Sequence, residues 1–284
     1  MLPKMGWKRD LPNIKDFTME SEQIKPLLKG LNKPISKDVD LRKGFSPVED
    51  QGNIGSCTSQ AAAALLEYFE LNSQGKYIDA SRLFLYYGAR ILGGYFPGDN
   101  GAEIRNAMGA LVLFGSPPEK FWPYKEELVN SVPDPVCFAL AQSYQAVKYY
   151  RLDTPKKTRQ DVLNDIKLHL SNSIPVMFGF TCYSSLDRPE VAKTGAIPYP
   201  SVKEKMEGGH AIVAAGFSDD KIIVNPFSGK KTIGALLIRN SWGTNWGQEL
   251  KGYGWLPYQY VLDGLAVDFW VMLSSEWVDI DLFS

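Results

Sequence analysis

Residues 47–69 read PVEDQGNIGSCTSQAAAALLEYF, a glycine-bearing loop that runs directly into a series of good helix formers. Cys57 stands at the start of the predicted helix, just after Gly55 and Ser56. A helix N-terminus presents unpaired backbone N–H groups and a partial positive charge, and both stabilise a thiolate. A cysteine at a helix start can equally be a small buried core residue. Cys57 is therefore a candidate nucleophile that needs a partner.

The chain contains two histidines, so the choice of a base is narrow. His169 lies within a helix predicted over 158–171, and we interpret it as a helix-face residue. His210 follows Gly208 and Gly209 and opens an apolar run over 211–217, so a strand there could present it to a cleft. A satisfied core histidine is the competing interpretation of His210 taken alone. A cysteine nucleophile needs a base or an ion-pair partner, and His210 is the better candidate.

The third informative segment is RNSWGTNWG, residues 239–247. Asn240 follows the apolar run 235–238 and is expected at a strand end. Its amide oxygen can accept a hydrogen bond from one imidazole nitrogen, which leaves the other nitrogen to face the sulfur. Trp242 and Trp246 could keep water away from this hydrogen bond and so strengthen it. Taken alone, the segment could also be a turn-forming Asn with two packing tryptophans.

Three segments together resemble, in the right order, the signature segments of the papain-like cysteine peptidases: PVEDQGNIGSC (47–57), GGHAIVAAGF (208–217) and IRNSWGTNWG (238–247). The resemblance covers about residues 39–275. It implies an α+β, papain-like two-lobed fold, in which the active-site cleft lies between a helical lobe and an antiparallel, β-barrel-like lobe. It also implies a cysteine endopeptidase that hydrolyses protein or peptide substrates.

The resemblance assigns a role to each catalytic residue. Cys57 would attack the peptide carbonyl and form a thioester, while His210 would pair with the thiolate and then protonate the leaving amine. Gln51 matches the oxyanion-hole glutamine, whose side-chain N–H would stabilise the tetrahedral intermediate together with the backbone N–H of Cys57. Asn240 would orient His210.

Substrate contacts are expected on both walls of the cleft. The segment 99–103 resembles the family's glycine-rich stretch, which pairs through its backbone with an extended substrate. Residues 177–179 are expected near an apolar pocket for a hydrophobic side chain two residues before the scissile bond. Ordinary strand and turn packing is the alternative for these positions. The expected substrate-binding residues are Gly101, Ala102, Gly179, Gly209, Ala211, Trp242 and Trp246, with Trp242 covering the His–Asn contact and Trp246 lining the primed side.

The chain departs from the family pattern at two positions beside the nucleophile. Ile54 stands where many members have a disulfide cysteine, and Thr58 replaces the usual tryptophan. The common disulfides of secreted relatives therefore cannot form. Three cysteines cannot all pair within one chain, so Cys137 and Cys182 are expected to be free, although a bond between them stays open.

Composition excludes several other classes of protein. Of the 284 residues, 44% are hydrophobic and 22% are charged, which is ordinary globular usage. The net charge of −1 argues against a general nucleic-acid binder. No apolar stretch approaches the ~20 residues that span a bilayer, and the first residues lack the apolar core of a secretory signal. We expect no membrane partner, no metal or organic cofactor, and a monomer. The missing signal favours an intracellular protein, with a sequence that begins after a removed signal as the alternative.

The chain divides into a leader and a peptidase domain. Residues 1–37, here called the leader, are polar with spaced apolar anchors and are expected to form a propeptide-like segment over the cleft, as in a zymogen. A constitutive part of the fold or an ordered tail is the alternative. Residues 38–284 form the peptidase domain, with a helical lobe over about 45–145 and a β-rich lobe over about 146–284. Helices are predicted at 57–69, 80–92, 102–114, 134–145 and 158–171, and strands at 176–180, 211–217, 221–224, 235–239 and 265–272.

Three alternatives to an endopeptidase stay open at this point. A non-catalytic binding protein could keep the fold, because folds can outlive functions. An acyl transferase could use the same thioester and pass the acyl group to an amine or thiol. An exopeptidase would need a histidine-bearing loop or a chain terminus in the cleft, and the tail 275–284 is short.

Overall fold

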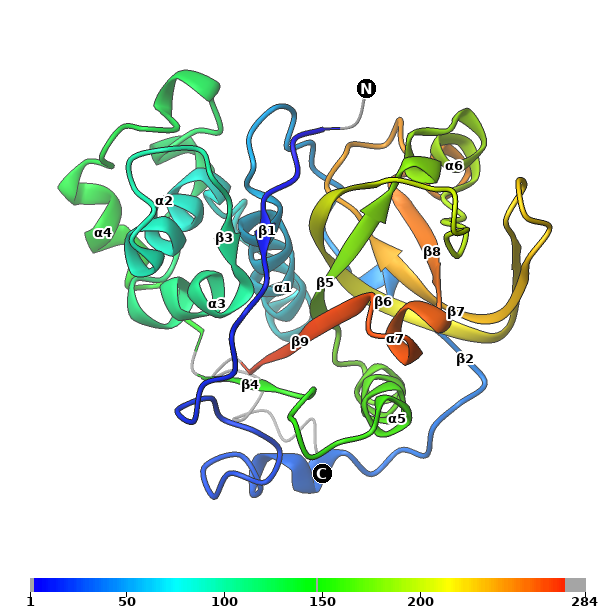
Figure 1. Ribbon diagram of the computed structural model, residues 1–284. Helices are drawn as coiled ribbons and strands as arrows, with labels where there is room; N and C mark the ends of the chain where they lie inside the picture. The colour runs from blue at the N-terminus through cyan, green and yellow to red at the C-terminus, as the bar shows by residue number, and fades with distance from the viewer. Residues whose placement is uncertain (1–2, 147, 274–284) are drawn as a thin grey trace.

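A computed structural model describes residues 3–146 and 148–273, and it folds them into two lobes (Figure 1). The helical lobe contains α1 (Cys57–Gln74), α2 (Arg82–Gly93), α3 (Ile104–Leu113) and α4 (Pro135–Ala141). The other lobe is built on an antiparallel sheet with α5 (Arg159–Ser171), α6 (Pro189–Thr194) and α7 (Gln259–Leu262) around it. The α+β, two-lobed architecture expected from the sequence is confirmed.

Helix α1 is the central element of the helical lobe and lies against the sheet lobe (Figure 1). Every residue from Cys57 to Glu70 is buried, which is the pattern of a helix packed on all sides. The helix ends at Gly75, whose φ of 70° gives the left-handed conformation that terminates many helices. Because α1 is fixed on all sides, its first residue is held rigidly at the junction of the two lobes.

The sheet has seven strands in the order β4-β9-β5-β6-β7-β8, with β2 pairing to β6. All neighbouring pairs are antiparallel. The strands are β2 (Asp38–Asp40), β4 (Lys148–Arg151), β5 (Val176–Tyr183), β6 (Met206–Val224), β7 (Lys231–Arg239), β8 (Tyr253–Pro257) and β9 (Ala266–Leu273). Strands β5 and β6 lie at its centre and both contact α1, so α1 packs against the middle of the sheet.

The predicted elements agree with the structure, with a few differences. The runs 211–217 and 221–224 belong to one strand, β6, whose register shifts at Ala214/Gly216 and Ser218/Ile222 account for the apparent break. Of the strands in this sheet, β2, β4 and β8 were not predicted. The helix predicted at 134–145 ends at Ala141, whereas α5 matches the helix predicted at 158–171.

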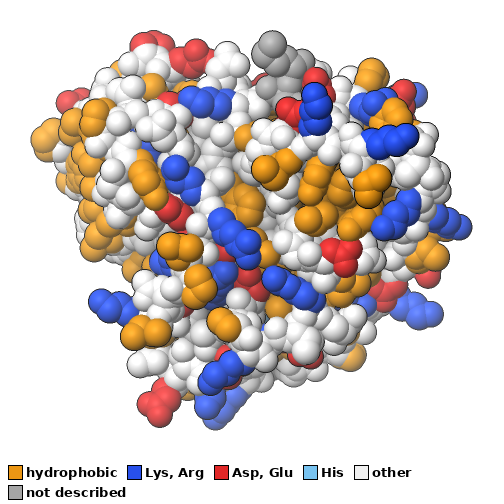
Figure 2. Space-filling model, viewed as in Figure 1, with side chains coloured by type: hydrophobic (Ala, Val, Ile, Leu, Met, Phe, Trp, Pro, Cys, Tyr) orange, Lys and Arg blue, Asp and Glu red, His pale blue; other side chains and the backbone are white. Residues whose placement is uncertain are grey.

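The leader follows an extended path across one face of the molecule. It descends between the two lobes, where β1 (Trp7–Lys8) pairs in parallel with β3 (Ala102–Glu103), and then turns beneath the sheet lobe (Figure 1). Figure 2, viewed from the same side, shows Lys and Arg side chains along this path and a group of hydrophobic side chains beside it. The later leader packs onto the sheet lobe: Ile24 is fully buried, and the backbone N–H of Arg151 donates to the carbonyl of Phe17.

Three further observations concern the rest of the described chain. Cys137 and Cys182 are buried and free. Within residues 3–146 and 148–273, the structure contains no helix long and apolar enough to cross a membrane. The tail 275–284, considered above for an exopeptidase, lies outside the described residues.

Candidate active site

Cys57 is the first residue of α1 and lies against strand β6 of the other lobe. Its sulfur accepts a hydrogen bond from the backbone N–H of Ala211 at 3.5 Å, and Ala211 is the residue that follows His210. The side chain is completely buried. The structure therefore brings together, across the junction of the lobes, the nucleophile and the base predicted from two segments 153 residues apart.

The hydrogen bonds around Asn240 determine which nitrogen of His210 carries the proton. The backbone N–H of Ser241 donates to Asn240 Oδ1 at 2.8 Å, so that atom is the carbonyl oxygen of the amide. His210 Nε2 lies 2.7 Å from the same oxygen and must donate to it. In the neutral ring the proton is then on Nε2 and Nδ1 is an acceptor. Nδ1 is buried and has no hydrogen-bond partner among the described residues, which leaves it available for a proton from Cys57.

Aromatic rings fix the imidazole from both sides. Trp242 stacks on His210 with ring centroids 4.5 Å apart and planes 27° apart, and Phe180 meets the ring edge-on at 5.9 Å. Trp246 packs edge-on against Trp242 at 5.6 Å. Trp242 therefore contacts His210 directly, while Trp246 reaches the site through Trp242.

Gln51 lies at the mouth of the same site with its amide orientation fixed. Its Oε1 accepts a hydrogen bond from the hydroxyl of Ser241 at 2.7 Å, so Nε2 is the group that faces the cleft. Nε2 donates to the carbonyl of Ile54 at 3.0 Å and to the carbonyl of Lys4 in the leader at 2.9 Å. Gln51 thus already binds a peptide carbonyl oxygen beside the nucleophile.

Burial keeps both candidate catalytic groups neutral in this state. Desolvation raises the pKa of the Cys57 thiol to about 11, although backbone amides that include those of Ala211 and Gly6 act in the opposite direction. Desolvation lowers the pKa of His210 to about 4, opposed by its hydrogen bond to Asn240. At neutral pH the covered site therefore holds a thiol and a neutral imidazole.

Leader residues Gly6 and Trp7 occupy the positions at which substrate contacts were predicted. The backbone N–H of Ala102 donates to the carbonyl of Gly6 at 2.9 Å, and a Cβ on Gly101 would lie 2.0 Å from the same oxygen. On the opposite wall, the indole of Trp7 takes the space that a Cβ would need at Gly179 (2.0 Å) and at Gly209 (2.6 Å). These four positions line one channel, and the leader fills it.

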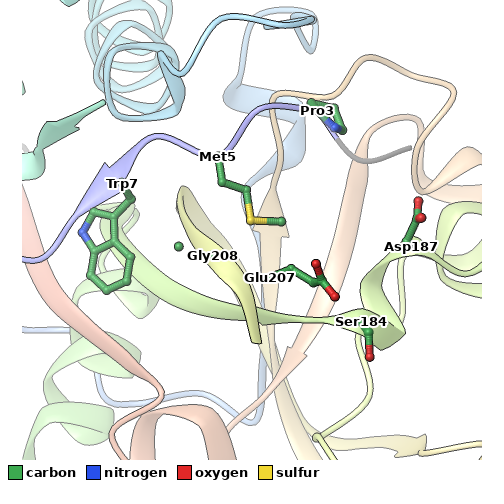
Figure 3. Close-up of a pocket in the computed structure, with 8 residues that line it drawn as sticks. Pro3, Met5, Trp7, Ser184, Asp187, Glu207 and Gly208 are labelled. Carbon is green, nitrogen blue, oxygen red and sulfur yellow. The ribbon is translucent and has the colours of Figure 1, made fainter. Parts of the chain in front are cut away.

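A pocket of about 480 Å³ opens beside the leader on the sheet lobe (Figure 3). The Met5 side chain points into it, against Gly208, and Asp187 and Glu207 add carboxylates to its wall. Met177 and Phe178, considered as possible pocket residues, are fully buried with the leader in place. Of the stretch 177–179, Gly179 lies against the indole of Trp7.

A buried cluster of charges anchors the leader below the channel. Asp10 is 2% exposed, its backbone N–H donates to Asp268, and its carboxylate accepts from the indole N–H of Trp270 at 2.8 Å. Arg105 binds Asp16 of the leader through two hydrogen bonds of 2.7 and 2.8 Å. Burial raises the pKa of Asp10 to about 6 and that of Asp268 to about 7.

Sequence reasoning missed Asp99, which the structure places beside Gly55 and the nucleophile. Its carboxylate accepts hydrogen bonds from the backbone N–H of Gly55 (3.0 and 3.2 Å) and from the hydroxyl of Tyr86 (2.6 Å). It also pairs with Lys4 of the leader at 2.7 Å. The segment 99–103 was recognised, but only for its backbone, and nothing in the sequence pairs Asp99 with Gly55.

His169 is not part of the site. It is fully buried in α5, where its ring bonds to the Tyr150 hydroxyl at 2.6 Å and to the carbonyl of Asp165 at 2.7 Å. The helix-face interpretation was right in excluding it from the site but did not foresee complete burial. Among the described residues, no group of three His, Cys, Asp or Glu side chains could hold a metal ion.

Comparison with known proteins agrees with this geometry. The model of the family described as papain family cysteine protease matches residues 35–261. The chain belongs to the papain family of cysteine proteases. Membership of this family makes the chain a peptidase, whose substrates are proteins or peptides.

Relatives and solved structures place the chain within the family. It is 34% identical, over 93% of its length and 80% of the relative's, to an uncharacterized peptidase C1-like protein of Acanthamoeba polyphaga mimivirus. Cysteine proteinase 1 of Entamoeba histolytica is 28% identical over 84% of this chain and 69% of its own length. The structure of xylellain, a cysteine protease from Xylella fastidiosa, superposes with a TM-score of 0.76 at 31% identity and covers 95% of this chain and 96% of its own.

Proposed function

We propose that this papain-family peptidase is an endopeptidase that uses Cys57 as nucleophile, His210 as base and Asn240 to orient the base. The observation that carries the proposal is the fixed tautomer of His210, which leaves Nδ1 buried and unpartnered while the next residue, Ala211, contacts the sulfur of Cys57. A base with no other partner beside a buried thiol is the arrangement that activates a cysteine nucleophile.

The proposed reaction passes through a thioester. Cys57 transfers its proton to His210 and its sulfur attacks the scissile carbonyl, while Gln51 Nε2 and the backbone N–H of Cys57 stabilise the resulting oxyanion. His210 then gives the proton to the leaving amine, and the amine departs as the thioester forms. Water, deprotonated by His210, attacks the thioester and releases the acid, which restores the thiol.

The proposal also implies that the peptidase is inactive while the leader occupies the channel. The leader binds Gln51 through Lys4, the glycine-rich wall through Gly6 and the opposite wall through Trp7. A substrate needs these surfaces, so it cannot bind until residues 4–7 leave the channel. The leader also desolvates Cys57 and His210, which opposes formation of the thiolate–imidazolium pair.

Alkylation of Cys57 as a function of pH, read by intact mass, tests the pair directly. In a variant with a displaced leader, such as Gly6→Ala, we expect labelling well below the ~8.5 pKa of a free thiol. His210→Ala should shift labelling back towards that value, and Cys57→Ser should abolish it. Labelling that follows an ordinary thiol in the opened chain would contradict the proposal.

Product analysis on an unfolded protein substrate tests the reaction type. Internal cuts that disappear in Cys57→Ala identify an endopeptidase, whereas removal of terminal residues alone would identify an exopeptidase. With added amines or thiols, free acid should remain the main product. Products joined to the added nucleophile as the main outcome would instead indicate a transferase.

A further inference from the structure

The side-chain amide of Gln51 is aimed at the cleft by two contacts. Its Oε1 accepts from the hydroxyl of Ser241 at 2.7 Å, and its Nε2 donates to the carbonyl of Ile54 at 3.0 Å. An amide nitrogen carries two hydrogens, so Ile54 holds one of them and the other is free to bind an oxyanion. The carbonyl of Lys4 takes that second hydrogen while the leader is in place. The direction of the Ile54 carbonyl therefore determines where the free hydrogen of Gln51 points.

Asp99 holds the other side of the same peptide unit. The carbonyl of Ile54 and the N–H of Gly55 belong to one planar group, so an acceptor that fixes the N–H also fixes the carbonyl. This N–H donates to the two carboxylate oxygens of Asp99, at 3.0 and 3.2 Å. A charged acceptor forms the stronger hydrogen bond, and it polarises the carbonyl of the same unit towards Gln51. A continuous chain of hydrogen bonds thus runs from Asp99 to the amide of Gln51.

The carboxylate of Asp99 is itself fixed within the peptidase domain. The hydroxyl of Tyr86 donates to its Oδ1 at 2.6 Å and accepts from the backbone N–H of Gly101 at 2.9 Å. Tyr86 is fully buried, and the guanidinium carbon of Arg90 lies 4.1 Å from its ring centroid. Lys4 binds the other oxygen, Oδ2, so the contacts of Oδ1 do not depend on the leader. We expect the carboxylate to keep its position when the leader leaves the channel.

The loop before the nucleophile depends on this contact because no disulfide fastens it. Ile54 stands where many family members have a disulfide cysteine, and all three cysteines of the chain are free. The close approach of the carboxylate also requires glycine at position 55. A Cβ on Gly55 would lie 3.2 Å from Asp99 Oδ1, nearer than the 3.4 Å at which ordinary contact begins. Hydrogen bonds of Asp99 thus join the loop to the segment 99–102, which carries the glycine-rich wall.

We propose that Asp99 is a positioning residue that directs the amide of Gln51 into the oxyanion hole through the peptide unit of Gly55. The inference rests on the proposed function, which makes Gln51 a donor to the oxyanion. Asp99 touches no reacting atom in this role. Its loss should therefore slow a reaction that develops an oxyanion and spare a reaction that does not.

Two reactions of Cys57 separate this role from a purely structural one. Hydrolysis of an N-blocked Phe-Ala coumarin amide passes through an oxyanion, so it uses Gln51. Displacement of iodide from iodoacetamide by the thiolate forms no oxyanion, so it needs only the pair of Cys57 and His210. A variant that damages the fold or the pair slows both reactions, whereas a misdirected oxyanion donor slows the first alone.

All variants are made in the full Gly6→Ala chain, whose leader is displaced. We expect Asp99→Ala to lower kcat about tenfold with little change in the alkylation rate, because loss of a whole oxyanion donor costs about 100-fold or more. Asp99→Asn keeps an oxygen that can accept from Gly55 and Tyr86, so its kcat should stay within about threefold. Glu127→Ala, which removes an exposed carboxylate from the same lobe, is the matched control and should change neither rate.

A double variant tests the route through Gln51. Gln51→Ala removes the donor that Asp99 positions, so adding Asp99→Ala should lower kcat no further. A further fall of about tenfold in the double variant would mean that the two residues act independently, and the inference would be wrong.

Three other outcomes overturn the inference and leave the proposed function standing. They are an unchanged kcat in Asp99→Ala, an equal fall in its kcat and alkylation rate, and a kcat of Asp99→Asn as low as that of Asp99→Ala. If Asp99→Ala does not fold, Tyr86→Phe replaces it, since it removes the donor that fixes Oδ1: kcat should fall about threefold with alkylation unchanged, and an unchanged kcat overturns the inference. Absence of Cys57-dependent turnover of both the coumarin amide and an unfolded protein in the Gly6→Ala chain is a failure of the proposed function instead.

Discussion

A methyl group added to Gly6 should expel the leader from the cleft. A Cβ at this position would lie 1.8 Å from the carbonyl oxygen of Gly55 and 2.4 Å from its carbon. Ordinary contact begins at 3.4 Å, so the two backbones would have to separate by about 1.6 Å (3.4 − 1.8). Gly55 precedes the rigid helix α1 by two residues, so the leader has to move.

The magnitude follows from the contacts that such a movement breaks. Two hydrogen bonds at 2.9 Å, from Gln51 to Lys4 and from Ala102 to Gly6, contribute about 1 kcal/mol each. The half-buried indole of Trp7 contributes about 1.5–2 kcal/mol, roughly half the cost of removing a fully buried one. The sum of about 3.5 to 4 kcal/mol corresponds to a rise in the open fraction of at least about 100-fold, unless the open form already predominates.

The assay is the rate of Cys57 alkylation by iodoacetamide at neutral pH, read by intact mass on the full chain. We expect Gly6→Ala to be labelled about 10- to 100-fold faster, since the labelling rate follows the open fraction until opening itself becomes limiting. Ile14→Ala is the matched control, because Ile14 belongs to the same leader and is fully exposed. Its labelling rate should not change.

Equal labelling of Gly6→Ala and the unaltered chain, with the same thermal unfolding midpoint, would refute the reasoning. It would mean either that residues 4–7 do not occupy the channel in solution or that they leave it freely. Faster labelling of Ile14→Ala as well would point to general loosening of the leader and not to the contact at Gly6.

Four further outcomes are expected. Asn240→Ala, which removes the 2.7 Å hydrogen bond to His210, should lower kcat about 100-fold. Asn245→Ala, in the exposed part of the same loop, is the control and should leave kcat unchanged. Equal activity of the two variants would show that Asn240 does not orient His210. Gln51→Ala should lower kcat by about 100-fold or more with a smaller effect on KM, as measured by steady-state kinetics, if it stabilises the oxyanion. Burial raises the pKa of Asp10 from 3.8 to about 6, so the anchored leader is stabilised when Asp10 is protonated and its anchorage weakens as the pH rises through about 6. The rate of Cys57 alkylation, divided by that of Gly6→Ala at the same pH, should therefore rise over this range. Asp10→Asn should flatten the rise. Burial lowers the pKa of His169 to about 4 from 6.5, so the free energy of unfolding should decrease by roughly 3 kcal/mol as the pH falls from 6.5 to 4, and less steeply in His169→Gln when followed by urea unfolding.

The sequence locates the residues of the candidate site because they follow short, local patterns. Cys57 begins a helix at the end of a glycine-bearing loop, and His210 and Asn240 belong to neighbouring strands, β6 and β7, or follow them directly. Each position could be found from residues within about ten places of it. The structure then supplied what the local pattern lacks, which is the direction of the hydrogen bond between His210 and Asn240.

The features that the sequence did not predict depend on contacts between distant segments. Asp99 acquires its place through the backbone of Gly55, which is 44 residues away, and through the leader. The leader was expected over the cleft from its composition and position, but the identity of its contacting residues depends on which glycines leave space in the walls. Gly179 and Gly209 look like ordinary strand glycines until the Trp7 indole is placed against both.

The path of the leader also sets how it would compete with a substrate. Residues 4–7 lie in the channel, while β2 (Asp38–Asp40) binds the chain that follows them to β6 of the same lobe. A displaced leader therefore stays within reach of the channel. Its effective concentration there is millimolar for short flexible linkers, and diluting the protein does not lower it. One cut between residue 8 and β2 would change that relation, because the freed peptide would then dissociate and dilute as any other inhibitor does.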